Sequence, residues 1–329
     1  MRNQAFRLAK YPQGTLSIDM FDLLPFPLPQ LTQGEFLVKQ SYMSLEPALQ
    51  SWQHKTLLNP SSPAVFDDVL QAYGVGMVIQ SLNAQFPVGA MVVGPTTWSE
   101  YVLGCEEMQI VDPTLPAEAI LAIFYLTGLT AYAGLIKIGH AQSGETVLIS
   151  DASSSVGALL GQLAKAQGLK VLGIVESEGQ CTWLKQQLGF DAALNENAPD
   201  LATELKTAAP HGIDLFYPNT LRSSFDKVMH HMNQYARIVW GTTHAVQTQH
   251  QPKHAMDWAD IQRKSLHLQG FVVADYLDYQ EEANRVIAAL LQQGLIQYKV
   301  HVIDDLAHLP QRLIEYFNHD HIGQLMVKF

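Results

Sequence analysis

Residues 146–175 read TVLISDASSSVGALLGQLAKAQGLKVLGIV, and this stretch decides the fold. Thr146–Ser150 and Lys170–Val175 are short apolar runs with the length of buried strands. The segment between them has a helical pattern that ends at Gly168. Its apolar positions are Val156, Leu159, Leu160, Leu163 and Ala164. Two buried strands joined by an amphipathic helix predict a parallel strand–helix–strand crossover.

The alternation of strands and helices continues towards the C-terminus. A helical pattern through Trp183, Leu184 and Leu188 ends at Gly189. Further strands are predicted at Ile213–Tyr217, Ala236–Gly241 and Leu266–Val273, with helices between them. Short connections between alternating strands and helices predict a doubly wound α/β domain, whose parallel sheet is covered on both faces.

The N-terminal third has a different rhythm of short, strand-like runs separated by turn residues. The runs are Glu35–Met43, Gly74–Gln80, Met91–Gly94 and Thr97–Leu103. They predict a compact antiparallel barrel or sandwich, followed by helices at Pro116–Leu121 and Thr127–Ile138. In the tail, strands at Val300–Ile303 and Gln324–Lys328 flank a helix at Leu309–Phe317, and we expect this tail to return to the first domain. The predicted domains are 1–122, completed by 300–329, and 123–299, since 329 residues exceed one ordinary core.

The charge and the cysteine content limit the function classes. The chain has 20 basic and 31 acidic residues, a net charge of −11, which argues against a nucleic-acid or anionic-membrane surface. We expect no transmembrane helix, and Met1–Lys10 lacks the apolar core of a signal peptide. Cys105 and Cys181 are the only cysteines, which excludes a multi-cysteine metal site and fits a reducing compartment. The cytoplasm is the expected location.

The turn after the first strand of the crossover is a candidate phosphate-binding loop. In a nucleotide-binding crossover, this turn presents backbone N–H groups and a helix N-terminus to a pyrophosphate. The G-x-G-x-x-G spacing falls on Ala152, Ser154 and Gly157, so only the last glycine is present. The serines, Ser153 to Ser155, can donate hydroxyl hydrogen bonds to phosphate, whereas Asp151 adds a negative charge. The alternative is a capped helix start that binds nothing.

The end of the second strand is the candidate ribose site. Glu176 and Ser177 stand at this strand end. An acidic side chain in this position commonly accepts hydrogen bonds from the adenosine ribose hydroxyls and repels a 2′-phosphate. The alternative is a solvated glutamate that opens a helix, where the helix dipole favours a negative charge.

The sequence resembles the zinc-independent medium-chain reductases, and most closely their prostaglandin reductase and alkenal double-bond reductase branch, with the quinone oxidoreductases. The resemblance spans nearly the whole chain. The segments that carry it are Tyr42–Pro47, Trp98–Tyr101, Gly128–Tyr132, Val156–Gly157, Gly161–Gln162, Leu188–Ala193, Gly212–Asp214, Ala236–Ile238, Gly270–Val272 and Gly323–Lys328.

The resemblance implies a GroES-like β-barrel domain joined to a Rossmann domain, with the active site in the cleft between them. It also implies a homodimer formed through the nucleotide domains, with Leu266–Val273 as a possible edge strand. Zinc-dependent relatives carry a Cys/His/Cys-type catalytic site, but Met43 occupies the region of the first ligand here. We therefore expect no zinc.

The cofactor implied by the resemblance is NADPH, bound by residues of the second domain. The implied cofactor-binding residues are Thr130, Ala152, Ser153, Ser154, Ser155, Val156, Gly157, Glu176, Ser177, Gln180, Asn219, Gly241, Thr242, Phe271, Val272 and His321. Several depart from the family pattern. The family's lysine for the 2′-phosphate aligns with Gln180, and its small residue aligns with Glu176, so both changes remove attraction for a phosphate and favour NADH.

The implied reaction is hydride transfer to the double bond of a small α,β-unsaturated carbonyl or to a quinone. The developing enolate oxygen needs a hydrogen-bond donor, but the family's tyrosine aligns with Val246. The candidate donors are His244, Tyr42 and Tyr125, for each of which a packing role is the alternative. The alternative function is a non-catalytic relative that acts as a nucleotide sensor or an interaction protein.

Histidines and a thiol are the remaining reactive side chains. His319 and His321 flank Asp320 and can in principle chelate a metal, although a solvated turn is favoured. Cys181 lies near the start of a helix, which can lower the pKa of a thiol, but burial against the sheet is favoured.

Overall fold

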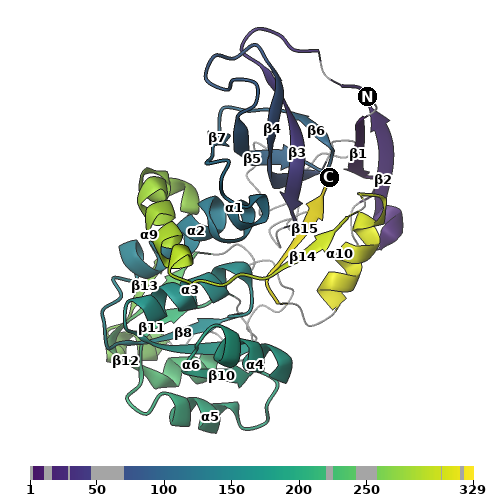
Figure 1. Ribbon diagram of the computed structural model, residues 1–329. Coiled ribbons are helices and arrows are strands. Elements are labelled where there is room, and N and C mark those ends of the chain that lie inside the picture. The colour runs from purple at the N-terminus through teal and green to yellow at the C-terminus, as the bar shows by residue number, and fades with distance from the viewer. Residues whose placement is uncertain are drawn as a thin grey trace. The chain divides into compact units, whose positions relative to one another are not determined.

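The computed structural model describes residues 3–10, 17–28, 30–45, 70–219, 225–241, 258–304, 306–318 and 322–329. The chain divides into two compact units (Figure 1). The first unit comprises Met1–Ala122, Val300–His319 and Gln324–Phe329, and the second comprises Ile123–Lys299 and Asp320–Gly323.

The first unit contains a seven-stranded sheet and a separate two-stranded ribbon. The main sheet has the order β14-β15-β3-β4-β5-β7, with β6 paired to β3, and the ribbon is β1-β2. Its strands are β1 (Asn3–Leu8), β2 (Phe21–Phe26), β3 (Phe36–Ser44), β4 (Gln71–Ser81), β5 (Met91–Thr97), β6 (Tyr101–Leu103), β7 (Gln109–Ile110), β14 (Val300–Ile303) and β15 (Gln324–Lys328). Its helices are η1 (Ile18–Met20), α1 (Ala117–Ile123), η5 (Leu306–His308) and α10 (Leu309–Asn318).

The C-terminal strands β14 and β15 complete the sheet of the first unit. β15 pairs antiparallel with β3, and β14 pairs with β15 in the only parallel contact among the described strands of this sheet. The ribbon β1-β2 was not predicted as strands. Its aromatic residues Phe6 and Phe21 contact the buried Trp98, and Phe21 stacks on the Trp98 ring at 5.8 Å.

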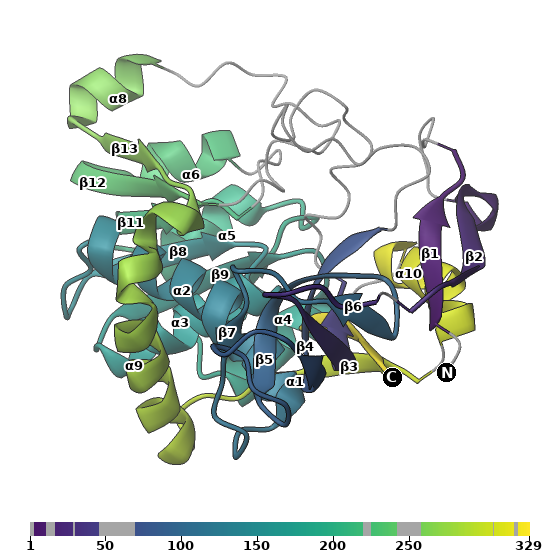
Figure 2. The ribbon, with the colours of Figure 1, turned by 90° about the horizontal axis from the view of Figure 1, so that it is seen from above.

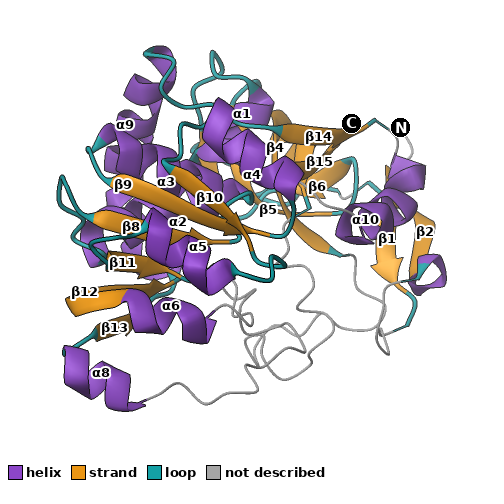
Figure 3. Ribbon diagram, turned by 90° about the horizontal axis from the view of Figure 1, so that it is seen from below, coloured by secondary structure: helices purple, strands orange, loops and turns teal. Residues whose placement is uncertain are grey.

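The second unit is a six-stranded parallel sheet with the order β10-β9-β8-β11-β12-β13 (Figure 3). Its strands are β8 (Thr146–Ser150), β9 (Lys170–Val175), β10 (Ala192–Asn195), β11 (Ile213–Tyr217), β12 (Met232–Trp240) and β13 (His267–Gly270). Its helices are α2 (Tyr125–Tyr132), η3 (Ala133–Ile138), α3 (Ser155–Ala166), α4 (Glu178–Gln187), α5 (Leu201–Ala208), α6 (Phe225–His231), α8 (Trp258–Lys264), η4 (Val273–Tyr279) and α9 (Gln280–Gln292).

Helices cover both faces of this sheet, which makes it doubly wound. On one face, Leu148, Leu172 and Phe216 pack against the apolar sides of α5 and α6. On the other face, Gly173 of β9 lies beneath Leu184 of α4, and α3 lies on the same side. The predicted parallel α/β architecture is therefore confirmed.

Several predicted elements differ from the observed ones in their bounds; for example, the strand predicted at Ala236–Gly241 is observed as Met232–Trp240. The predicted helix Thr127–Ile138 begins earlier, at Tyr125, and its second half is the π-helix η3, in which the Gly139 N–H donates to the Gly134 carbonyl. Only His267–Gly270 of the predicted strand Leu266–Val273 pairs with β12, because the chain turns into the 3-10 helix η4 at Val273. By length and composition, Ala117–Ile138 would suffice to cross a membrane, but most of it is buried inside the fold.

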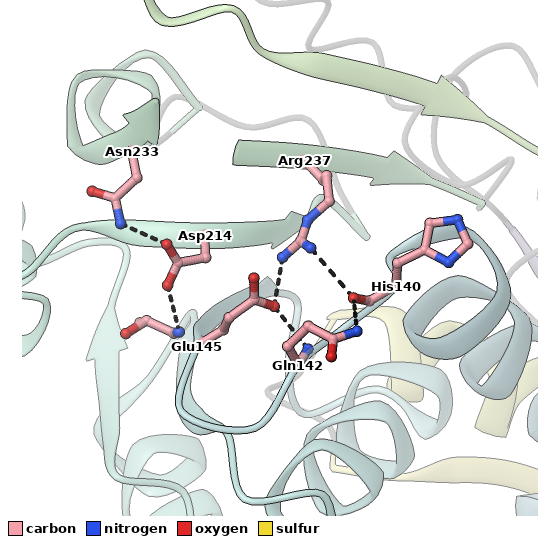
Figure 4. Close-up of polar contacts among 7 residues, drawn as sticks. His140, Gln142, Glu145, Asp214, Asn233 and Arg237 are labelled. Carbon is pink, nitrogen blue, oxygen red and sulfur yellow. Dashed lines mark hydrogen bonds and ion pairs between the residues drawn. The ribbon is translucent and has the colours of Figure 1, made fainter. Parts of the chain in front are cut away.

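A polar network ties the loop before β8 to β12 (Figure 4). The guanidinium of Arg237 donates to the Glu145 carboxylate at 2.6 Å and to the His140 carbonyl at 3.3 Å. Glu145 also accepts from the Gln142 N–H at 2.8 Å. Arg237 and Glu145 are each about one-fifth exposed, at 20% and 24%, so water screens this ion pair only partly. These contacts anchor the amino-terminal edge of the sheet, opposite the edge where ligands bind in such folds.

Replacing Arg237 with Ala is expected to lower the free energy of unfolding by about 1–3 kcal/mol, since it leaves Glu145 without its charged partner. Arg237→Lys is the matched control, because lysine keeps the charge but cannot bridge two acceptors with one planar fork. We expect an intermediate loss for lysine, measured by urea denaturation. Equal stability of the alanine variant and the wild-type protein would show that the network contributes nothing.

Candidate cofactor site

The sheet of the second unit has its topological switch point between β8 and β11. The helix after β8 lies on one face of the sheet, and the helix α6 that follows β11 lies on the other. The carboxyl ends of these two neighbouring strands form the switch point, and this is where open α/β sheets bind their ligands. The turn Asp151–Ser154 and the residue Asn219 occupy these two strand ends.

The turn after β8 is tight and closed by its own serine. Asp151 adopts a φ of +48°, a left-handed conformation that a non-glycine residue seldom adopts. Ser154 is the N-cap of α3, and its hydroxyl accepts from the Gly157 N–H at 3.2 Å. A Cβ on residue 157 would lie 2.6 Å from the Asp151 carbonyl oxygen and 2.9 Å from the Ala152 Cα. Only glycine fits there without a shift of the turn.

The start of α3 offers two backbone donors. The Ala158 N–H bonds to the Ser154 carbonyl, and the Gly157 N–H is capped by the Ser154 side chain. Within the described part of the chain, no acceptor lies within bonding distance of the Ser155 and Val156 N–H groups. A 12-residue helix directs these two donors and the positive end of its dipole at the switch point. The turn therefore fits a diphosphate, as in other nucleotide-binding crossovers.

Asn219 spans the switch point from the β11 side. Its amide nitrogen donates to the Ser154 hydroxyl at 2.6 Å and lies 3.4 Å from a carboxylate oxygen of Asp151. Asn219 is 5% exposed, so this contact is buried. The structure thus brings together the predicted site residues Ser154, Gly157 and Asn219.

At the end of β9, the side chain of Gln180, which was expected to face the cofactor, bonds to the backbone instead. The Gln180 side chain turns back and accepts from the N–H groups of Glu176, at 2.9 Å, and Ser177, at 3.1 Å. The Ser177 hydroxyl accepts in return from the Gln180 N–H, which completes a capping box at the start of α4. Gln180 is therefore buried as a cap, whereas Glu176 keeps a half-buried carboxylate at the strand end.

Two hydrogen bonds to backbone carbonyls, one in the turn after β8 and one at the end of β9, were not predicted from the sequence. The Gly323 N–H donates to the Ser153 carbonyl at 2.9 Å, and the Asn197 side chain donates to the Glu176 carbonyl at 2.9 Å. Both partners lie far away along the chain, so no local pattern indicates them. The left-handed φ of Gly323, +81°, is the kind of feature that a lone glycine before a strand can signal.

Sequence and structure comparisons identify the family. Residues 4–111 match the family profile described as the N-terminal domain of oxidoreductase, and residues 155–290 match the one described as zinc-binding dehydrogenase. Prostaglandin reductase 1 of Bos taurus is 31% identical over 99% of this chain and 98% of its own length. The chain belongs to the zinc-independent medium-chain dehydrogenase/reductase family. It is an oxidoreductase.

Two further relatives extend this result. The NADPH-dependent curcumin reductase of Escherichia coli (strain K12) is 28% identical over 99% of this chain and 97% of its own length. The crystal structure of CurA from Vibrio vulnificus in complex with NADPH superposes with a TM-score of 0.91 at 29% identity, covering 99% of this chain and 98% of that one. The GroES-like and Rossmann architecture expected from the resemblance is therefore confirmed.

The remaining predicted cofactor residues of this medium-chain reductase lie in varied surroundings. Thr130 is buried, and its hydroxyl donates to the Leu126 carbonyl within α2. The Phe271 ring lies against Gly241, where any Cβ would fall 1.9 Å from it. Val272 is 63% exposed. Thr242 and His321 lie outside the described residues.

The candidate proton donors lie in different units or outside the described residues. Tyr42 is a half-buried residue of β3 in the first unit, with the Lys328 ammonium 5.9 Å from its ring centre. Tyr125 starts α2 in the second unit with a φ of +48°, and its N–H donates to the Asn284 side chain at 3.3 Å. A left-handed tyrosine is strained, and such strain clusters at functional sites. His244 lies outside the described residues.

The described residues contain neither an assembled metal site nor an activated thiol. Met43 is completely buried in the core of the first unit. No group of three or more His, Cys, Asp or Glu side chains is placed to hold a metal ion in the part of the chain that the structure describes. Burial raises the pKa of the Cys181 thiol to about 11, so the start of α4 does not activate this cysteine as a nucleophile.

Proposed function

We propose that this protein is an NAD(P)H-dependent, zinc-independent reductase that acts on the double bond of a small α,β-unsaturated carbonyl or on a quinone. The observation that carries this proposal is the start of α3, where two N–H donors face the switch point beside a glycine that admits no side chain. The relatives named above include, by their names, a prostaglandin reductase and an NADPH-dependent curcumin reductase, and CurA was crystallised with NADPH. A bound reduced nicotinamide would supply the hydride.

In this proposal, residues of the chain bind and orient the dinucleotide. The Ser155 and Val156 N–H groups hold the diphosphate, and Glu176 accepts from the adenosine ribose. Tyr42, Tyr125 and His244 remain the candidates for the donor to the enolate oxygen. We infer that the first unit is the substrate and catalytic domain, that the second is the dinucleotide domain, and that the protein works in the cytoplasm.

Binding and turnover test the function separately. The purified protein is titrated with NADPH and NADH while nicotinamide fluorescence and melting temperature are followed. Cofactor oxidation is then measured with added enals, enones and quinones. We expect saturable binding and substrate-dependent oxidation. Binding without oxidation of any substrate class would favour the nucleotide sensor, and a lack of binding to either cofactor at millimolar concentration would overturn the enzyme proposal.

Cofactor preference depends on Glu176 in this proposal. Its carboxylate repels a 2′-phosphate, whereas Gln180 is engaged in the α4 cap and adds no cation. We expect Glu176→Gln to shift the NADPH-to-NADH affinity ratio towards NADPH about tenfold, or about 1.4 kcal/mol. Glu196→Gln, at the end of the neighbouring strand, is the control for charge alone. An unchanged ratio in Glu176→Gln would refute the role of this carboxylate.

Dimerisation is proposed through the edge of the second unit's sheet. β13 has one neighbour among the described strands, β12, and all four of its residues are exposed (Figure 2). An edge with an exposed Leu268 is suited to pair with a second copy. We expect sedimentation at twice the 36.5 kDa of one chain, and dissociation by Leu268→Glu but not by Leu24→Glu in β2. A monomeric wild-type protein would contradict this assembly.

A further inference from the structure

The Ser154 hydroxyl is saturated with hydrogen bonds. It donates to the Asp151 carbonyl at 2.8 Å, and it accepts from the Gly157 N–H at 3.2 Å and from the Asn219 amide at 2.6 Å. A hydroxyl has one proton and two lone pairs, so these three partners use its whole capacity. In this arrangement the Ser154 hydroxyl therefore has no proton left to donate to a phosphate.

This saturation matters because Ser154 stands at the second glycine of the G-x-G-x-x-G spacing. That glycine lets the backbone approach a pyrophosphate without an intervening side chain. A freely rotating serine would place its hydroxyl in this approach path. Here the Oγ atom is held inward, against the turn and the first turn of α3.

Asn219 supplies the one contact in this set that does not come from the loop itself. It lies 65 residues from Ser154 in sequence and makes the shortest of the three hydrogen bonds. Its second contact, to the Asp151 carboxylate at 3.4 Å, holds the other end of the same turn. Because Asn219 is buried, its amide cannot easily exchange Ser154 for water.

We propose that Asn219 is a positioning residue that allows this phosphate loop to carry serine in place of glycine. By holding the Ser154 hydroxyl inward, it keeps the Ser155 and Val156 N–H groups accessible to a diphosphate. The inference rests on the proposed dinucleotide site. According to this inference, Asn219 affects cofactor affinity only when residue 154 has a side chain. A general structural role of Asn219 would instead affect affinity whether residue 154 is serine or glycine.

A double-mutant cycle on cofactor affinity tests the proposal. Asn219→Ala, Ser154→Gly and the double variant are titrated with NADH and with NADPH, and dissociation constants are measured by calorimetry. We expect Asn219→Ala to weaken both cofactors about tenfold, the size of one lost buried hydrogen bond, with an unchanged ratio between them. Ser154→Gly is expected to bind at least as tightly as the wild-type protein, and the double variant should match Ser154→Gly.

A measurement without cofactor gives an independent readout. Loss of Asn219 frees Ser154 to rotate, so the Gly157 N–H loses its cap, and hydrogen exchange over residues 151–158 should become faster in Asn219→Ala. Exchange over the distant loop before β8 should not change. Asn219→Ser replaces Asn219→Ala in the cycle if the alanine variant does not fold.

The outcomes separate this inference from the proposed function. An equal loss of affinity on removing Asn219 in both backgrounds, or no loss in either, overturns the positioning role while leaving the dinucleotide site intact. A wild-type protein that binds neither cofactor overturns the proposed function itself. Full recovery of affinity in the double variant supports the proposal.

Discussion

Gly157→Val is expected to raise the dissociation constants for NADH and NADPH by at least about 100-fold, or about 2.7 kcal/mol. The new side chain would begin at a Cβ only 2.6 Å from the Asp151 carbonyl oxygen and 2.9 Å from the Ala152 Cα. Both are backbone atoms, so the turn must move away from α3. The Ser155 and Val156 N–H groups would then no longer point together at the switch point. Fluorescence titration measures the loss.

Gly179→Ala is the matched control for this substitution. Gly179 lies in the first turn of α4, and a Cβ at this position would have the Ser177 hydroxyl oxygen, at 3.8 Å, as its nearest neighbour. Alanine there fits an ordinary helix and is expected to stabilise the protein by about 0.4–1 kcal/mol without weakening either cofactor. Near-normal cofactor binding by Gly157→Val would mean that the turn after β8 does not hold the diphosphate.

Phe190→Ala is expected to lower the free energy of unfolding by about 3–5 kcal/mol, the cost of removing a buried aromatic ring. The ring is 4% exposed and fills a slot made by two glycines. A Cβ on Gly161 of α3 would fall 2.1 Å from it, and one on Gly173 of β9 would fall 3.2 Å from it. Phe190 thus packs the helix that carries the phosphate donors onto the sheet. Urea denaturation measures the change.

Two variants control for the Phe190 result. Leu295→Ala removes an apolar side chain that is 54% exposed and is expected to cost less than about 1 kcal/mol. Phe190→Leu keeps part of the volume and should make Gly161→Ala less destabilising than it is in the wild-type protein, because the two positions share one space. Additive effects of the Gly161 and Phe190 substitutions would contradict this packing.

Local patterns predicted several strands to the residue. Thr146–Ser150, Lys170–Val175 and Ile213–Tyr217 were all predicted with their observed bounds. Each is an apolar run bounded by turn residues or by a helical pattern, and a fully buried parallel strand needs little else. The ribbon β1-β2 was not predicted, because neither strand is a continuous apolar run: polar residues interrupt β1, and β2 contains Pro25 and is exposed over its second half.

The amino-acid sequence by itself determined the crossover around β8, the requirement for Gly157 and the class of protein. The crossover and the glycine follow from periodicity and residue type within a few tens of residues, whereas the class of protein follows from a family resemblance that spans nearly the whole chain. Only the tertiary structure decided where the polar side chains of the site point. Ser154 turned inward towards Asn219, whereas the cap that Gln180 makes on α4 is a local capping box that the pattern Ser177-x-x-Gln180 already indicates. A hydroxyl or an amide bonds to whichever partner the fold brings within about 3 Å, and Asn219 reaches Ser154 only because β8 and β11 are neighbours in the sheet.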